Sequence, residues 1–235
     1  AGLDSKLSQG RVQTPKISEV IGRLLGVKQT SEFEALTFSY PKGGLQTIWD
    51  SIYQKSQSVG EFHLSREVIK IEMNGQRVVG IGTRSADGTE KDFVVGPGDT
   101  VFSTLPLGFY PKLISSFSLD IAAKIEKYIR LNDLILVFFK MKMDSLLDES
   151  WVFVPDPDVV FHRISEQESF DPSMTPNGTI VCCEIMDNSG RPMGEKSDQE
   201  LIQLALSGIE KLKSLKLEYI DAMVMRIDKS YPVFV

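Results

Sequence analysis

The chain has few of the side chains that usually hold metal ions or form disulfides. Its 235 residues include two cysteines, Cys182 and Cys183, and two histidines, His63 and His162. The histidines are far apart, and no cluster of Cys, His and Asp has the spacing of zinc ligands. Neighbouring residues on a strand point to opposite faces, so a disulfide between the adjacent cysteines would be strained. We therefore expect reduced thiols and the absence of a metal site. Reduced thiols are typical of a cytoplasmic protein.

Long apolar runs and an excess of positive charge are also missing. No apolar run approaches the roughly 20 residues that span a bilayer, and the first residues lack the charged start and apolar core of a signal peptide. The 32 acidic residues outnumber the 26 basic ones, which gives a net charge of −6. Nucleic-acid binding needs a basic face that releases counterions. We expect neither a nucleic-acid partner nor a transmembrane segment.

The glycine patterns that bind nucleotides are incomplete. Gly80 and Gly82 form one Gly-x-Gly pair, and Gly96 and Gly98 form another. Neither pair continues to a third glycine that opens a helix, as the dinucleotide fingerprint requires. The chain also lacks a Gly-x-Ser-x-Gly elbow and a Walker loop. No catalytic residue can be named from the sequence, and difficult chemistry would have to come from a cofactor.

The composition that remains is that of an ordinary globular protein, with 42% apolar and 25% charged residues. Helical spacing of apolar residues predicts helices over residues 17–26, 44–52, 121–129 and 197–215. Runs of β-forming residues predict strands over residues 61–64, 68–72, 77–83, 90–95, 100–104, 131–143, 151–154, 159–165, 179–186 and 219–227. Helices and strands do not alternate regularly. We expect an α+β fold, with an antiparallel meander and a second, mixed or antiparallel sheet that carries helices on one face.

The most informative motif is Tyr40-Pro41-Lys42-Gly43-Gly44, just before a predicted helix. Paired glycines at a helix start let the backbone approach a ligand, and exposed amides there favour an anion or an electron-rich carbonyl. A plain turn capped by glycine would have the same sequence. The residues alone leave both interpretations open.

Together with the meander that follows, this motif resembles the amine-oxidase-like flavoproteins. That family includes protoporphyrinogen oxidase and UDP-galactopyranose mutase, and its Tyr-Pro-x-Gly-Gly segment lies near the flavin ring and the substrate. Residues 66–71 resemble the family strand whose valine binds the adenine of FAD through its backbone, and the matching position is Val68. Ser103, Thr104 and Pro106 match the family's Ser-Thr-x-Pro beside the cofactor.

A second resemblance lies further along the chain, in the stretch from residue 161 to residue 170. It is similar to the Tyr-x-Arg-x-x-Glu-x-Lys-x-Phe stretch of UDP-galactopyranose mutases and of flavoproteins linked to lipopolysaccharide synthesis. Arg163 matches the arginine and could bind a diphosphate or the flavin in bidentate fashion. Glu166 should point to the opposite side of the strand. Glu168 replaces the family lysine, which weakens the case for a nucleotide-sugar substrate, and a surface cluster of charges is the alternative.

The resemblance implies the central portion of an FAD-dependent oxidoreductase, inactive by itself, that acts on an amine, a porphyrinogen-like compound or a sugar nucleotide. Residues 1–106 would belong to the FAD-binding domain and residues 107–235 to the substrate domain. Gly43, Gly44, Val68, Ser103, Thr104 and Pro106 would then bind the cofactor, and Tyr40, Lys42 and Arg163 the substrate. His162 should form hydrogen bonds rather than act as a base. Two alternatives remain, a mutase-like enzyme of cell-surface polysaccharide synthesis and a non-catalytic binding module. Apolar surface left exposed would favour self-association.

Overall fold

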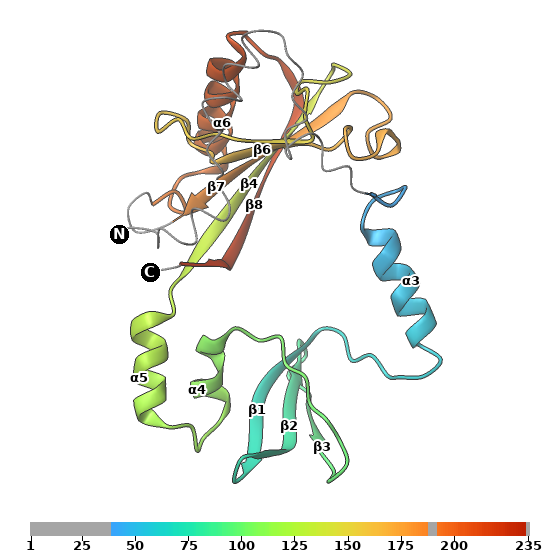
Figure 1. Ribbon diagram of the computed structural model, residues 1–235, viewed down its shortest axis with the longest axis vertical. Helices are drawn as coiled ribbons and strands as arrows, with labels where there is room; N and C mark the ends of the chain where they lie inside the picture. The colour runs from blue at the N-terminus through green and yellow to red at the C-terminus, as the bar shows by residue number, and fades with distance from the viewer. Residues whose placement is uncertain (1–38, 188–191, 234–235) are drawn as a thin grey trace, which may run out of the picture. The chain divides into compact units, whose positions relative to one another are not determined.

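The computed structural model describes residues 39–187 and 192–233, and the helix expected over residues 17–26 lies outside them. The described chain forms two compact units (Figure 1). One comprises Ser51–Leu131, and the other comprises Asn132–Val235 together with the segment that ends at Asp50. The division expected at residue 106 concerns the domains of a whole enzyme, and it stays a prediction.

The Ser51–Leu131 unit contains the predicted meander. Strands β1 (Arg66–Asn74), β2 (Arg77–Ser85) and β3 (Glu90–Val94) form an antiparallel sheet in the order β1-β2-β3. The sheet is followed by the short 3-10 helix η1 (Leu107–Phe109), by α4 (Tyr110–Leu113) and by α5 (Leu119–Tyr128). Ser118 caps α5 by accepting a hydrogen bond from the Ile121 amide. Helix α3 (Gln46–Ser56) precedes the meander, as predicted, and spans the sequence boundary between the units.

Two predicted strands of this unit are wrong. Residues 61–64 and 100–104 are irregular in the structure. Phe102, which the pattern placed on a short apolar strand, is 91% exposed. A strand needs a partner for its backbone groups, and a short run of β-forming residues does not reveal whether that partner exists.

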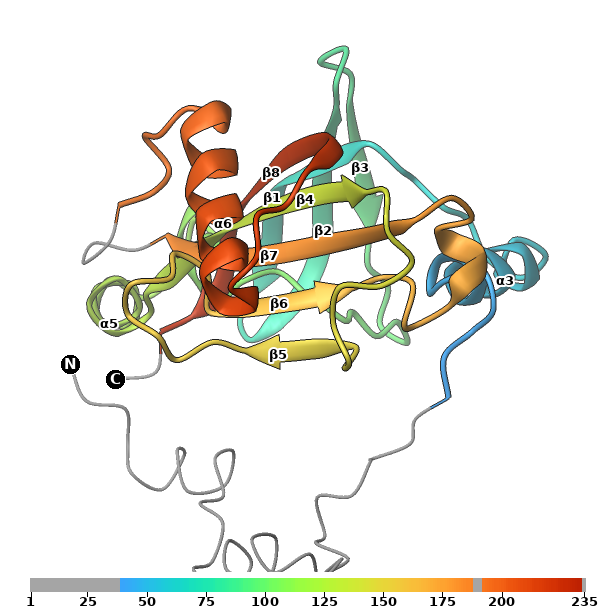
Figure 2. The ribbon, with the colours of Figure 1, turned by 90° about the horizontal axis from the view of Figure 1, so that it is seen from above.

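The larger unit is a five-stranded sheet in the order β5-β6-β7-β4-β8 (Figure 2). The strand pairs β5/β6, β6/β7 and β7/β4 are antiparallel. The strands of this sheet are β4 (Leu131–Met141), β5 (Trp151–Phe153), β6 (Arg163–Glu166), β7 (Thr179–Asp187) and β8 (Tyr219–Pro232). Helix α6 (Asp198–Lys213) lies over one face, and the 3-10 helix η2 (Pro172–Met174) lies between β6 and β7 in the chain. These elements confirm the α+β fold.

The main core lies between α6 and the sheet. Alternate residues of β4, β7 and β6 pack against one side of the helix, which presents Leu201, Ala205 and Ile209. Burial on β4 alternates from Ile135 onward, and Lys140 is exposed. An uninterrupted apolar run such as that of residues 134–139 is typical of a strand buried on both faces, but only one face of β4 is fully buried.

Both cysteines are reduced and buried on β7, as expected. Burial raises the pKa of the Cys182 thiol to about 12 and holds that of Cys183 well above its ordinary value. The two thiols are therefore poor nucleophiles. Within the described residues, no helix is long and apolar enough to cross a membrane.

Candidate functional site

The Tyr40–Gly44 segment forms a tight turn immediately before α3. The Gly44 amide donates a hydrogen bond to the Pro41 carbonyl over 3.0 Å. Gly43 and Gly44 have φ angles of +83° and +91°, values that strain any residue with a Cβ atom. The two glycines are therefore required by the backbone path, and Lys42 is left exposed at the tip.

Asp171 anchors this turn to the loop after β6. Its carboxylate accepts a hydrogen bond from the Gly43 amide, and it also accepts bonds from the Ser173 amide at 3.0 Å and the Ser173 hydroxyl at 2.8 Å. The bond from Gly43 contributes most to lowering the pKa of Asp171. The side chain of Met174, further along the same loop, lies against Gly44. The glycine turn and the loop after β6, which are more than a hundred positions apart in the sequence, are thus in contact.

Aromatic stacking extends this contact onto the sheet. The Tyr40 and Phe170 ring centroids are 5.2 Å apart. Phe170 in turn stacks on Trp151 at 5.9 Å with an interplanar angle of 14°. Trp151 is the first residue of β5 and is 42% exposed. Tyr40 therefore joins a row of rings that begins on the edge strand.

Arg163 lies on the same side of the sheet as Trp151. Phe153 pairs with Arg163, and Trp151 pairs with Ser165, across the antiparallel β5/β6 ladder. Side chains two residues apart on a strand share a face. We call this side of the sheet, opposite α6, the aromatic face; it includes Trp151, Phe153, Arg163, Ser165, Cys182 and Glu184.

Glu184 occupies two of the Arg163 donors. The Nε and Nη2 atoms of Arg163 donate to the two Glu184 carboxylate oxygens over 2.6 and 2.7 Å. The guanidinium lies 5.8 Å from the Phe153 ring centroid, and it also interacts with Tyr231 of β8. The hydrogen bonds to Glu184 raise the pKa of Arg163 further. Arg163 is thus held in place, and a ligand would meet an already partnered cation.

Glu166 points away from the aromatic face, as predicted, and is fully buried. Its carboxylate accepts hydrogen bonds from the Leu146 amide at 2.6 Å, the Leu147 amide at 2.7 Å and the Ser145 hydroxyl at 3.0 Å. These bonds tie the loop that leads into β5 to the core. Sequence reasoning missed this role, although an acidic residue at a core position of a strand is a signal of it.

His162 lies just before β6, and its amide donates to the Glu184 carbonyl over 3.0 Å. Its ring Nδ1 atom is buried and has no hydrogen-bond partner among the described residues. Burial lowers the pKa of the ring. The backbone of His162 thus forms hydrogen bonds, as the sequence suggested, whereas its Nδ1 atom forms none with the described residues. In residues 39–187 and 192–233, no group of three or more His, Cys, Asp and Glu side chains could hold a metal ion.

The remaining sequence-predicted residues belong to the Ser51–Leu131 unit. Val68 is a half-buried residue of β1, the edge strand of its sheet. An edge strand leaves backbone donors and acceptors free on its outer side, which fits a strand that binds a nucleobase. Ser103 accepts a hydrogen bond from the Tyr110 hydroxyl at 2.7 Å. Thr104 is exposed, and Pro106 directly precedes η1.

Comparison with solved structures finds proteins that share the general fold of this chain. A reduced UDP-galactopyranose mutase has a TM-score of 0.73 and 16% identity, with 98% of this chain and 48% of that chain covered. An oxidoreductase from Methanosarcina mazei has a TM-score of 0.61 and 20% identity, with 80% and 43% covered. A candidate protoporphyrinogen oxidase from an Exiguobacterium species has a TM-score of 0.57 and 15% identity, with 79% and 40% covered. The chain therefore spans less than half of each of these structures.

No curated protein matches the chain. The family model described as flavin containing amine oxidoreductase, in contrast, matches residues 15–224. This match extends over most of the sequence and includes both the glycine turn and the aromatic face. The chain belongs to the family of flavin containing amine oxidoreductases.

Proposed function

We propose that the chain is part of an FAD-dependent oxidoreductase and that its aromatic face contributes to the binding of a small organic substrate. The observation that carries this proposal is a row of side chains on one side of the sheet: Arg163 beside Phe153, then Trp151 on the same face of β5, and from Trp151 through Phe170 to Tyr40. It connects the substrate residues suggested by the sequence with the glycine turn that the family places near the flavin. Such rows of partly exposed rings are typical linings of ligand sites.

The residues of the chain would have distinct roles. The rings of Tyr40 and Trp151 would provide flat apolar contacts, and Arg163 would orient an electron-rich group of the substrate. Asp171 would hold the turn in position, and the outer edge of β1 at Val68 would bind the adenine end of the cofactor. Bound FAD would accept a hydride from the substrate. We assign no general acid or base among the described residues.

A second candidate is a mutase-like enzyme that binds a sugar nucleotide. The position of Arg163 on the aromatic face favours it, since a guanidinium beside aromatic rings suits a diphosphate next to a nucleobase. The Glu184 partner and Glu168 at the family lysine position weigh against it. A non-catalytic binding module is the remaining alternative, and it would bind no flavin.

The visible absorption spectrum of the protein expressed from its full coding sequence tests the main proposal. We expect a flavin spectrum, and bleaching of that spectrum without oxygen when an oxidisable substrate is added. Amines, porphyrinogens and UDP-sugars should be screened in parallel. A colourless protein that takes up no added FAD would exclude the flavoenzyme and leave the binding module. The mutase would be favoured if the oxidised enzyme binds UDP tightly and none of the screened substrates bleaches its flavin spectrum.

The aromatic face can be tested separately on the same protein. We expect Tyr40→Ala and Trp151→Ala to raise the substrate KM severalfold while the flavin spectrum is retained. Trp49→Ala is a matched control, because Trp49 is 61% exposed on α3. Equal effects of all three changes would show that the row of rings has no special role in substrate binding.

A further inference from the structure

Strand β5, at the edge of the larger sheet (Figure 2), carries two exposed aromatic rings. Trp151 is 42% exposed and Phe153 is 63% exposed. They are two residues apart on one strand, so both side chains stand on the aromatic face. Phe153 thus has the most exposed ring of this face, at a strand edge that a ligand can approach from the side.

The spacing of the two side chains fits one flat ring between them. Each residue of a strand advances the chain by about 3.4 Å, so positions 151 and 153 are separated by about 6.8 Å. Carbon atoms in contact lie about 3.5 Å apart at their optimal separation. A planar ring inserted between Trp151 and Phe153 would therefore touch both of them. A saturated, puckered ring is thicker and would have to push the two side chains apart.

Both rings are held in place by their neighbours. Phe170 stacks on Trp151 at 5.9 Å with an interplanar angle of 14°, and its loop follows β6 beyond the point where Trp151 pairs with Ser165. Phe153 pairs with Arg163, whose guanidinium lies 5.8 Å from the ring centroid of Phe153. Side chains that are already ordered lose little freedom when a ligand binds. The two rings are therefore prepared to stack on a third.

The charges beside Phe153 determine which kind of ring fits. Arg163 and Glu184 neutralise each other through two hydrogen bonds, so an anion near them would gain attraction from one group and repulsion from the other. An arginine has five N–H donors, and Glu184 accepts from two of them. The guanidinium can also donate to a neutral acceptor, such as a hydroxyl or carbonyl oxygen. An uncharged ring with one acceptor group is therefore the best match.

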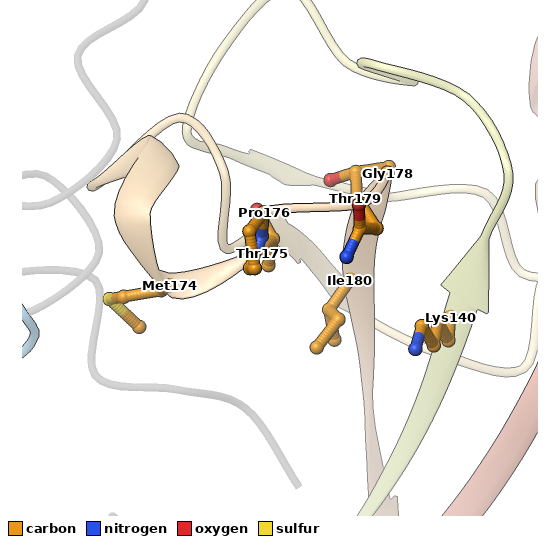
Figure 3. Close-up of a pocket in the computed structure, with 8 residues that line it drawn as sticks. Lys140, Met174, Thr175, Pro176, Gly178, Thr179 and Ile180 are labelled. Atoms are coloured by element: carbon orange, nitrogen blue, oxygen red, sulfur yellow. The ribbon is translucent and has the colours of Figure 1, made fainter.

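The hollow where β7 begins is too small for the body of an organic substrate (Figure 3). Lys140 of β4 and residues 174–180 line it, and its volume is about 120 Å³. Pockets that bind small organic ligands usually have volumes of about 300–1,000 Å³. A ring compound thus gains more apolar contact from the exposed rings of β5 than from this hollow.

We propose that the substrate of the aromatic face is a planar, uncharged aromatic or conjugated ring compound that inserts between Trp151 and Phe153, and that Phe153 determines this selectivity. The inference rests on the proposed function, because it names the class of substrate for the same face. It favours neutral ring compounds over sugar nucleotides, whose diphosphate is charged, and over aliphatic amines, which have no ring.

Isothermal titration of the protein from its full coding sequence with three matched probes tests the class of ligand. 2-Naphthalenemethanol is planar and neutral, decahydro-2-naphthalenemethanol is its saturated counterpart, and 2-naphthoate is planar and charged. We expect the planar alcohol to bind saturably and about tenfold more tightly than either of the others, because it alone combines stacking with neutrality. Equal binding of the saturated alcohol, tighter binding of 2-naphthoate, or no saturable binding of any probe would overturn the proposal.

Variants connect the binding to Phe153. Phe153→Leu keeps an apolar side chain but removes the flat ring, so it should weaken binding of 2-naphthalenemethanol by about tenfold. Phe153→Tyr keeps the ring and should restore the binding. Phe62→Leu is the matched control, because Phe62 is 44% exposed and belongs to the Ser51–Leu131 unit. Unchanged binding in Phe153→Leu, or equal weakening by Phe62→Leu, would overturn the assignment of the ring to β5.

The flavin spectrum separates this inference from the proposed function. Titration detects binding of the planar probe whether or not a flavin is present. A colourless protein that binds the probe through Phe153 would exclude the flavoenzyme and support the ring site. A flavoprotein that binds the planar and saturated alcohols equally well would retain the flavoenzyme and overturn the ring site.

Discussion

At the scale of single residues, the ion pair between Arg163 and Glu184 has a measurable consequence for stability. The Glu184 side chain is 9% exposed and the Arg163 side chain 32% exposed, so solvent screens the pair only in part. Charge-assisted hydrogen bonds of this kind contribute about 1.5–3 kcal/mol. We expect Glu184→Gln to lower the free energy of unfolding by about that amount, as measured by urea denaturation.

A matched control for Glu184 is Glu90, which pairs with Arg84 at 2.8 Å on β3 and β2. Both of those side chains are about half exposed, and exposed pairs contribute about 0–1 kcal/mol. Glu90→Gln should therefore have little effect. A loss as large as that of Glu184→Gln would mean that burial does not strengthen the pair on the aromatic face.

The sequence predicted the side of the strand on which Arg163 and Glu166 lie, because alternation along β6 depends on local geometry alone. It did not predict Glu184 as the partner of Arg163. That contact depends on the β6/β7 register, in which Arg163 pairs with Glu184. Register is set by packing of the whole sheet, so no local motif reveals it.

At the scale of elements, the contact between the glycine turn and η2 should depend on pH. Asp171 has a pKa below its ordinary 3.8, mainly because its carboxylate accepts a hydrogen bond from the Gly43 amide. A lowered pKa means that the contact stabilises the fold fully above pH 3.8 and is lost as the pH falls through the folded-state value. We expect the Gly43 amide resonance to shift with a midpoint below pH 3.8.

The control for this titration is Asp171→Asn, which keeps the shape of the side chain and removes its ionisation. The Gly43 resonance of this variant should show no such midpoint. A midpoint at or above pH 3.8 in the unsubstituted protein would indicate that the turn is not held by the carboxylate in solution.

Helix α6 begins with a complete capping box. The Ser197 hydroxyl accepts from the Glu200 amide, and the Glu200 carboxylate accepts from the Ser197 amide at 2.9 Å. Removal of an N-cap hydroxyl costs about 1 kcal/mol, so Ser197→Ala should lower the free energy of unfolding by about that amount in chemical denaturation. Ser207→Ala, at an exposed position in the middle of α6, should be neutral or slightly stabilising. The opposite order of the two effects would contradict the capping role.

The helices were predicted better than the strands for a physical reason. Helix α6 was located from its apolar spacing and from Ser197, because its hydrogen bonds and its cap are local in sequence. Residues 61–64 and 100–104 carry similarly clear β-forming patterns but have no strand partner, and only the fold as a whole decides which segments pair. The connection of the glycine turn to Asp171 was missed for the same reason.

At the scale of the whole molecule, exposed apolar side chains predict self-association of the 235-residue chain. They include Val59 and Val94 at 88% exposure, Leu119 at 87% and Trp49 at 61%. These residues lie outside the main core under α6. Removal of large exposed apolar side chains from water is favourable, so each unit gains free energy if these residues are buried against another copy of the chain.

Sedimentation velocity at several concentrations would measure this association. We expect the average mass of the 235-residue chain to rise with concentration, and we expect the product of the full coding sequence, loaded with FAD, to sediment as one species across the same range. Replacement of Leu119 and Trp49 by serine should reduce the association of the 235-residue chain. Lys124→Ser, at an exposed polar position of α5, should not reduce it and serves as the control. A single monomeric species at every concentration would contradict this prediction, because the side chains would then stay exposed to water without driving association. The exposed apolar side chains would in that case not indicate a binding surface.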